Sequence, residues 1–111
     1  MGENIYMVPG RLTTTATVHS AACFLGRILI GTDGVSDPVV AVYNDTKATD
    51  ETKRVIPSVT YDASALGLNG VVLEFAEYLS NGLHITIANI GSGEVIYASR
   101  LASNISQYAF R

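Results

Sequence analysis

Apolar and polar residues alternate with a period of two along most of this chain. The clearest run is 83–88, where Leu83, Ile85 and Ile87 alternate with polar or small residues, and a second run covers 12–19. A period of two puts successive side chains on opposite faces of a β-strand, and no segment shows a sustained helical period. The pattern therefore predicts a chain built from strands. The remaining predicted strands are 23–30, 39–43, 55–61, 71–75 and 95–97.

Turn signals separate these strands at intervals of about ten residues. Asn69-Gly70 and Asn81-Gly82 are typical of tight hairpin turns, because Asn and Gly tolerate positive backbone angles. Regularly spaced short strands with turns between them indicate a sandwich or a barrel. We predict a single all-β domain over 1–111, a two-sheet antiparallel sandwich of jelly-roll type with about eight strands.

Two connections are longer than a hairpin turn. The polar stretch 45–53 is expected to protrude as a loop, and 62–68 is expected to hold one helical turn. Pro57 has no backbone N–H to donate to a neighbouring strand, so its strand is predicted to be an edge strand or to contain a bulge.

Two predicted strands, 23–30 and 39–43, are apolar on both faces. A sandwich buries one face of each strand, so the second apolar face needs further cover. Charged residues make up 15% of the chain, against roughly 25% in an ordinary globular domain. We therefore expect a component of an assembly, and a homodimer in which one of these strands meets the partner. Val40, Val42 and Tyr43 are the predicted contact residues of 39–43.

The two ends of the chain, 1–11 and 100–111, fall outside the alternating pattern. Free tails are usually poor in apolar residues, but these ends carry several. We predict that both ends are extended arms that lie along neighbouring subunits. The predicted contact residues of the arms are Ile5, Tyr6, Tyr108 and Phe110.

Charge and cysteine content exclude several classes of partner. The net charge is −3, and Lys53 and Arg54 are the only adjacent pair among seven basic residues, so no basic stripe for nucleic acid exists. Cys23 is the single cysteine, which excludes an internal disulfide, and its apolar neighbours indicate a packed thiol. The sequence has no apolar run of membrane-spanning length, and its first residues do not resemble a signal peptide. We expect the protein to be made and folded in a reducing cytoplasm.

Catalytic residues are not indicated. His19 and His84 both fall on the polar positions of predicted strands, where exposed histidines are ordinary. The serines lack the Gly-x-Ser-x-Gly context of a nucleophile elbow. Glu74 and Glu77 are not placed to face one bond, as a pair of hydrolytic carboxylates must be. A small hydrolase is the least favoured alternative.

No metal or cofactor is expected either. The segment 33–37 offers two aspartates, whereas a calcium loop supplies six or more oxygens, so an Asp-Gly turn is the better interpretation. The glycines near 31–34 and 91–93 do not form a phosphate loop between a strand and a helix.

Carbohydrate binding is a further alternative. Sandwich domains often present aromatic side chains to sugars, and the candidate residues are Tyr43, Tyr61, Tyr78 and Tyr97. Tyrosine is equally common at protein interfaces, and the chain contains no tryptophan.

The order of these segments resembles that of short β-sandwich structural proteins of tailed bacteriophages. In that group a strand ending in L-x-F precedes an N-G-L-x-I-x-I strand. The matching residues here are Leu73-Glu74-Phe75 and Asn81-Gly82-Leu83-His84-Ile85-Thr86-Ile87, followed by a last strand with Val95-Ile96-Tyr97. The chain is similar in particular to the small decoration or staple proteins that clamp neighbouring capsomers of short-tailed phage heads.

This resemblance implies a non-enzymatic virion protein on the outer surface of an icosahedral capsid, with the major capsid protein as its partner. Such a protein gains from many modest contacts repeated by symmetry, which suits low charge and apolar arms. The alternative is a carbohydrate- or host-binding module of a phage tail or spike.

Overall fold

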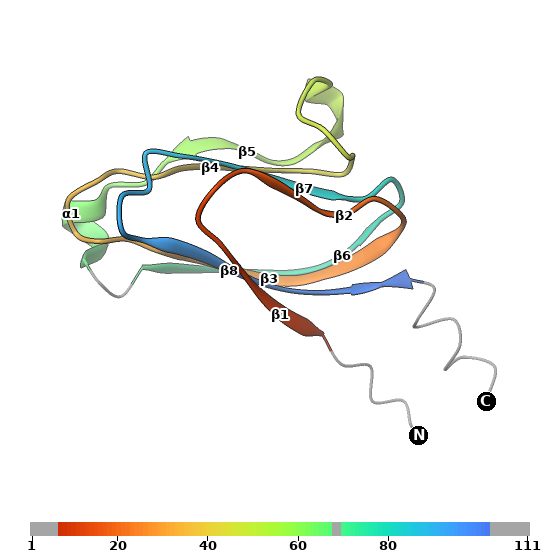
Figure 1. Cartoon of the computed structure of the whole chain (residues 1–111), viewed down its shortest axis with the longest axis horizontal. Helices are drawn as coiled ribbons and strands as arrows, with labels where there is room; N and C mark the ends of the chain where they lie inside the picture. Colours follow the sequence, from red (N-terminus) through yellow and green to blue (C-terminus); the bar gives the residue numbers. More distant parts are fainter. Residues whose placement is uncertain (1–6, 68–69, 103–111) are drawn as a thin grey trace.

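The computed structural model describes residues 7–67 and 70–102, which form two antiparallel four-stranded sheets packed face to face (Figure 1). The strands are β1 (Val8–Leu12), β2 (Ala16–His19), β3 (Cys23–Gly31), β4 (Val39–Tyr43), β5 (Arg54–Thr60), β6 (Val71–Leu79), β7 (Leu83–Ala88) and β8 (Glu94–Leu101). The loops contain a 3-10 turn, η1 (Glu51–Lys53), and a single helical turn, α1 (Ala63–Leu66).

The strand order is β1-β8-β3-β6 in one sheet and β2-β7-β4-β5 in the other. The chain passes repeatedly between the sheets, and every neighbouring pair is antiparallel. This is the order of a jelly roll, in which two Greek keys close around one core. The predicted fold class, an all-β two-sheet sandwich of jelly-roll type with eight strands, is confirmed.

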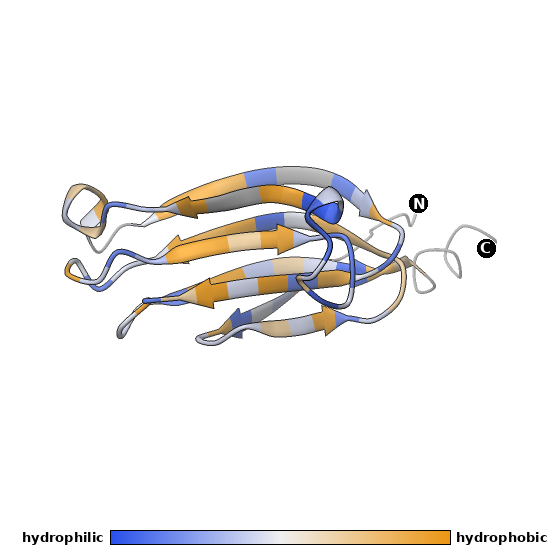
Figure 2. Ribbon diagram, turned by 90° about the horizontal axis from the view of Figure 1, so that it is seen from above, coloured by the Kyte–Doolittle hydropathy of each residue, from blue (hydrophilic) through white to orange (hydrophobic). Residues whose placement is uncertain are grey.

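The core lies between the inner faces of the two sheets. Apolar and polar residues alternate along the strands (Figure 2), and the apolar positions that point inward are almost completely buried. The largest side chains of this core that are fully buried are Leu25, Ile28, Ile30, Leu79, Leu83, Ile85, Val40, Val42 and Val95. Burying one side chain of this size contributes about 1.5–3 kcal/mol, so the core can stabilise the domain without a disulfide.

Strand boundaries follow the sequence prediction for some strands, but β6 extends to Leu79, four residues beyond its predicted end at 75. β4 matches its prediction, and β3 and β7 match within one residue. The prediction of one strand over 12–19 is wrong, because the chain leaves the first sheet at Leu12 and enters the second sheet at Ala16. The connection between these two strands consists of three threonines, so no glycine or proline marks the turn.

The predictions for the loops and for Pro57 are confirmed. The connection after β4 protrudes from the sandwich (Figure 1), and α1 supplies the expected helical turn. β5, which contains Pro57, is an edge strand, and its pairing with β4 shifts register between Val40 and Val42. An edge position tolerates the missing N–H.

The sandwich includes more of the two chain ends than the sequence suggests. Val8 to Arg11 belong to β1, and Arg100 and Leu101 belong to β8. The arm residues Ile5, Tyr6, Tyr108 and Phe110 lie outside the described residues.

Candidate functional site

The outer face of the sheet β2-β7-β4-β5 is covered in part by the chain's own loop 44–53. The Tyr43 hydroxyl donates to Glu51 Oε2 at 3.3 Å, and its ring contacts His84 at a centroid distance of 6.2 Å. Asn44 N donates to Lys53 O at 2.8 Å and closes the base of the loop. Tyr43 is therefore only 5% exposed, although it lies on the face away from the core.

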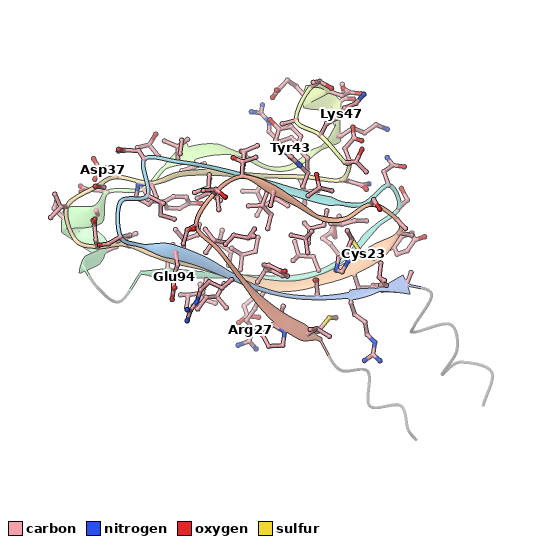
Figure 3. The ribbon with its side chains drawn as sticks, in the orientation of Figure 1. Cys23, Arg27, Asp37, Tyr43, Lys47 and Glu94 are labelled. Atoms are coloured by element: carbon pink, nitrogen blue, oxygen red, sulfur yellow. The ribbon has the colours of Figure 1, made fainter. Side chains whose placement is uncertain are left out.

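This loop changes the interpretation of the two-sided apolar strand 39–43. Val40 and Val42 face the core and are at most 1% exposed, and Tyr43 lies beneath the loop (Figure 3). These three residues, predicted to contact a partner, present almost no surface in the folded chain. The second apolar face of β4 already has its cover within the same molecule.

On the other sheet, the outer faces of β3 and β6 carry exposed side chains. Three cross-strand pairs between β3 and β6 lie on this face: Phe24 with Tyr78, Arg27 with Glu74, and Leu29 with Val72. The side chain of Arg27 projects from this sheet away from the core (Figure 3). Tyr78 is 54% exposed and Val72 is 50% exposed, so this face combines apolar surface with one ion pair.

A shallow groove lies beside that ion pair. Met7 and Pro9 line it, together with the small residues Gly26 and Ala98. The Met7 side chain comes so close to Gly26 that a Cβ at that position would lie 3.3 Å from Met7 Cγ. The residue just before β1 thus packs on the outer face of its own sheet.

One end of the sandwich is a tight cluster of loops. Asp33 Oδ1 accepts from the backbone N–H groups of Val35 and Ser36 at 2.9 and 2.8 Å, and Asp33 Oδ2 accepts from Ser92 N at 3.1 Å. These donors stabilise the carboxylate and lower the pKa of Asp33 to about 2. The segment 33–37 is therefore a turn, as the sequence indicated, and its Asp33 also ties two loops together.

His19 is not the exposed strand histidine that the alternating pattern predicts. The pairing of β2 with β7 shifts register between Thr17 and His19, so a bulge turns His19 toward the interior. A hydrogen bond of 2.8 Å joins its Nε2 to the hydroxyl of Ser99, which is 1% exposed. Burial lowers the pKa of His19.

The buried position of Ser99 makes this pair a poor catalytic dyad, because a substrate cannot reach the hydroxyl. His84 bonds through Nδ1 to Thr17 Oγ1 at 2.8 Å, on the opposite side of the second sheet. Cys23 is fully buried, which confirms the packed thiol, and burial raises its pKa to about 11. A thiol with so high a pKa is a weak nucleophile.

Within residues 7–67 and 70–102, no three His, Cys, Asp or Glu side chains come together as a metal site would require. Over the same ranges, none of the helices has the length and apolar character needed to cross a membrane.

The four tyrosines proposed for sugar binding do not form a platform. Tyr43 lies beneath its loop, Tyr61 packs against the core, and Tyr97 packs over Gly10. Tyr78 is the one of the four that is mainly exposed, and its ring centroid lies 5.1 Å from that of Phe24, with the two planes inclined by 51°.

Comparison with known proteins adds no relative. No protein-family model matches the chain, and no curated protein or solved structure gives a significant match.

Proposed function

We propose that this chain is a non-enzymatic virion protein that decorates the outer surface of an icosahedral phage capsid and staples neighbouring capsid subunits together. Its partner is the major capsid protein, and it acts as a homodimer. The observation that carries the proposal is the position of the two chain ends on a jelly-roll sandwich. β1 begins beside the end of β8, where Val8 pairs with Ser99.

Because of this pairing, the described part of the chain begins and ends at one corner of one sheet. The sequence beyond each of these two points is rich in apolar residues, with Ile5 and Tyr6 at one end and Tyr108 and Phe110 at the other. A rigid sandwich with two apolar segments at one corner suits a clamp: the sandwich rests on one subunit while the arms reach the next. Jelly rolls are frequent in viral shells, which agrees with this role as an analogy of fold.

The chemistry of the sandwich also suits a structural role. The histidines, the cysteine and Asp33 are each engaged in packing or in hydrogen bonds that hold the fold together. A sugar-binding tail module is less well supported, because three of the four candidate tyrosines are covered or packed within the chain.

The test is to locate and count the chain in purified virions of the phage that encodes it. Quantitative mass spectrometry against the major capsid protein gives the copy number, and cryo-electron microscopy gives the place. Hundreds of copies on the outer shell surface are expected. A dozen copies or fewer at the tail would overturn the staple and favour the receptor-binding alternative, and absence from the particle would overturn both.

A further inference from the structure

We infer that two copies of this chain pair through the outer faces of β3 and β6. The twofold axis that relates the copies lies in the interface and is parallel to these strands. This inference deepens the proposed function, on which it rests for the dimer, by naming the surface through which the copies meet. It keeps the predicted strand 23–30 as a partner contact and removes 39–43 from that role.

The residues of this face are arranged in three rows across the two strands. One row is aromatic, Phe24 beside Tyr78, with ring centroids 5.1 Å apart and planes inclined by 51°. The middle row is charged, Arg27 beside Glu74, and the third row is aliphatic, Leu29 beside Val72. Each row therefore holds two residues of matching or complementary chemistry.

A twofold axis in the interface, parallel to the strands, exchanges β3 and β6 between copies and keeps each row at its own level. The aromatic row then packs on the aromatic row of the second copy, and the aliphatic row packs on the aliphatic row. Arg27 faces Glu74 of the second copy, and its own Glu74 faces the second Arg27. This face is thus complementary to itself, as a twofold contact requires.

The charged row gains most from the second copy. Within one chain Arg27 Nε lies 4.0 Å from Glu74 Oε1, and the two side chains are 61% and 68% exposed. Such an exposed pair contributes little on its own. In the dimer two guanidinium groups and two carboxylates alternate, and the apolar rows on either side exclude water and strengthen their attraction.

The edges of the sheets are poor alternatives for pairing. β6 is a long edge strand, but its register shifts between Glu74 and Glu77, and Glu77, the cross-strand partner of Leu25, is an exposed charge on this edge. Bulges and charged side chains are devices that block pairing at an edge. β1 and β5 each contain a proline, and β2 has four residues and a bulge. Among the described residues, the exposed outer faces of β3 and β6 are therefore the better surface for a contact.

The test uses charge reversal and light scattering on the isolated protein. The wild type is expected to be a dimer. Arg27→Glu and Glu74→Arg should each be monomeric, because each variant places four like charges in the middle row. When the two variants are mixed in equal amounts, a dimer should return, since the carboxylate introduced at position 27 of one chain then faces the guanidinium introduced at position 74 of the other.

The mixture separates the contact between copies from the pair within one chain, because both variants keep like charges within the chain. Arg54→Glu is the matched control: it reverses a charge in the 2.9 Å pair with Glu51 on the other sheet and should leave the dimer intact. Val72→Lys, at an exposed position of the aliphatic row, should give a folded monomer by circular dichroism and light scattering, even if a charge reversal impairs folding.

A monomeric wild type, a mixture that stays monomeric, or equal dissociation by Arg54→Glu would each overturn this face. None of these results bears on where the protein lies in the virion. Conversely, a dimer that disappears as described but is missing from particles would overturn the proposed function and leave this contact standing.

Discussion

Asp33 holds two loops together through one carboxylate. Its donors come from the turn that follows β3 and from Ser92, in the loop before β8. Gly91 packs directly against this carboxylate with a positive φ of 60°, and a Cβ there would overlap Asp33 Oδ2. A position that demands both a left-handed backbone and no side chain suits glycine alone.

The acid sensitivity of the fold should depend on Asp33. Its folded pKa, about 2, is below the ordinary 3.8, so its contribution to stability is complete above about pH 4 and is lost as pH falls toward 2. In thermal unfolding followed from pH 5 to 2, Asp33→Asn should be less stable than wild type at pH 5, and the difference should shrink toward pH 2. The Asp45 carboxylate accepts from the backbone N–H of the adjacent Thr46, so Asp45→Asn is the control and should have a smaller effect. A difference that does not change with pH would contradict this assignment.

His19 should give the protein a second, milder pH dependence. Its folded pKa is lowered by burial, so the unfolded chain binds a proton first, and stability falls as pH decreases below about 6.5. His19→Gln should flatten the dependence of the melting temperature between about pH 5 and 7. If the variant keeps the pH dependence of the wild type, the bond between His19 and Ser99 does not control this range.

At the scale of the elements, strict alternation predicted the strands well, and irregular backbone defeated it. The face of the strand on which His19 lies could not be predicted from the sequence, because a bulge adds one residue that the alternating pattern does not reveal. The burial of Tyr43 was equally hidden, since its cover comes from a loop whose path depends on tertiary contacts. Pro57 was placed correctly because its missing N–H is a local property.

β1 illustrates how a neighbour can make a strand from an unpromising sequence. It contains Pro9-Gly10, which alone indicates a turn, but it forms the edge of a sheet beside β8. The Tyr97 ring fills the space that a side chain at Gly10 would occupy, so a Cβ there would overlap the ring. The glycine is required by its cross-strand partner.

Gly10→Ala should therefore destabilise the protein by about 1–3 kcal/mol, the usual cost of overpacking. Chemical denaturation should show that the same change costs less in a Tyr97→Leu background, because the smaller side chain frees the space. Gly31→Ala is the matched control within a strand, where the nearest atom to a new Cβ is Glu94 O at 3.5 Å, an ordinary contact. Equal costs in both backgrounds would show that Tyr97 is not the cause.

At the scale of the whole molecule, the proposed staple depends on the arms. Tyr108→Ala combined with Phe110→Ala should weaken binding to the capsid and leave the melting temperature of the isolated protein unchanged. Burial of one such side chain contributes roughly 1.5–3 kcal/mol before the cost of ordering the chain, so losing two should reduce affinity by at least tenfold. Binding is measured by co-sedimentation with capsids stripped of the protein. Unchanged binding would place the contacts elsewhere, and a lost thermal transition would assign these residues to the core.

The pairing of β1 with β8 also governs when this protein can finish folding. In the strand order of the sheet, the first strand to be synthesised has the last strand as its neighbour, and β8 separates β1 from β3. Pairing between such distant segments makes folding slow, on the scale of milliseconds to seconds. A chain that stops before β8 lacks the strand that joins β1 to β3, so its sheet β1-β8-β3-β6 is incomplete. β8 must therefore be synthesised before this sheet is complete, which keeps chains that lack it out of any assembly that recognises the finished sheet.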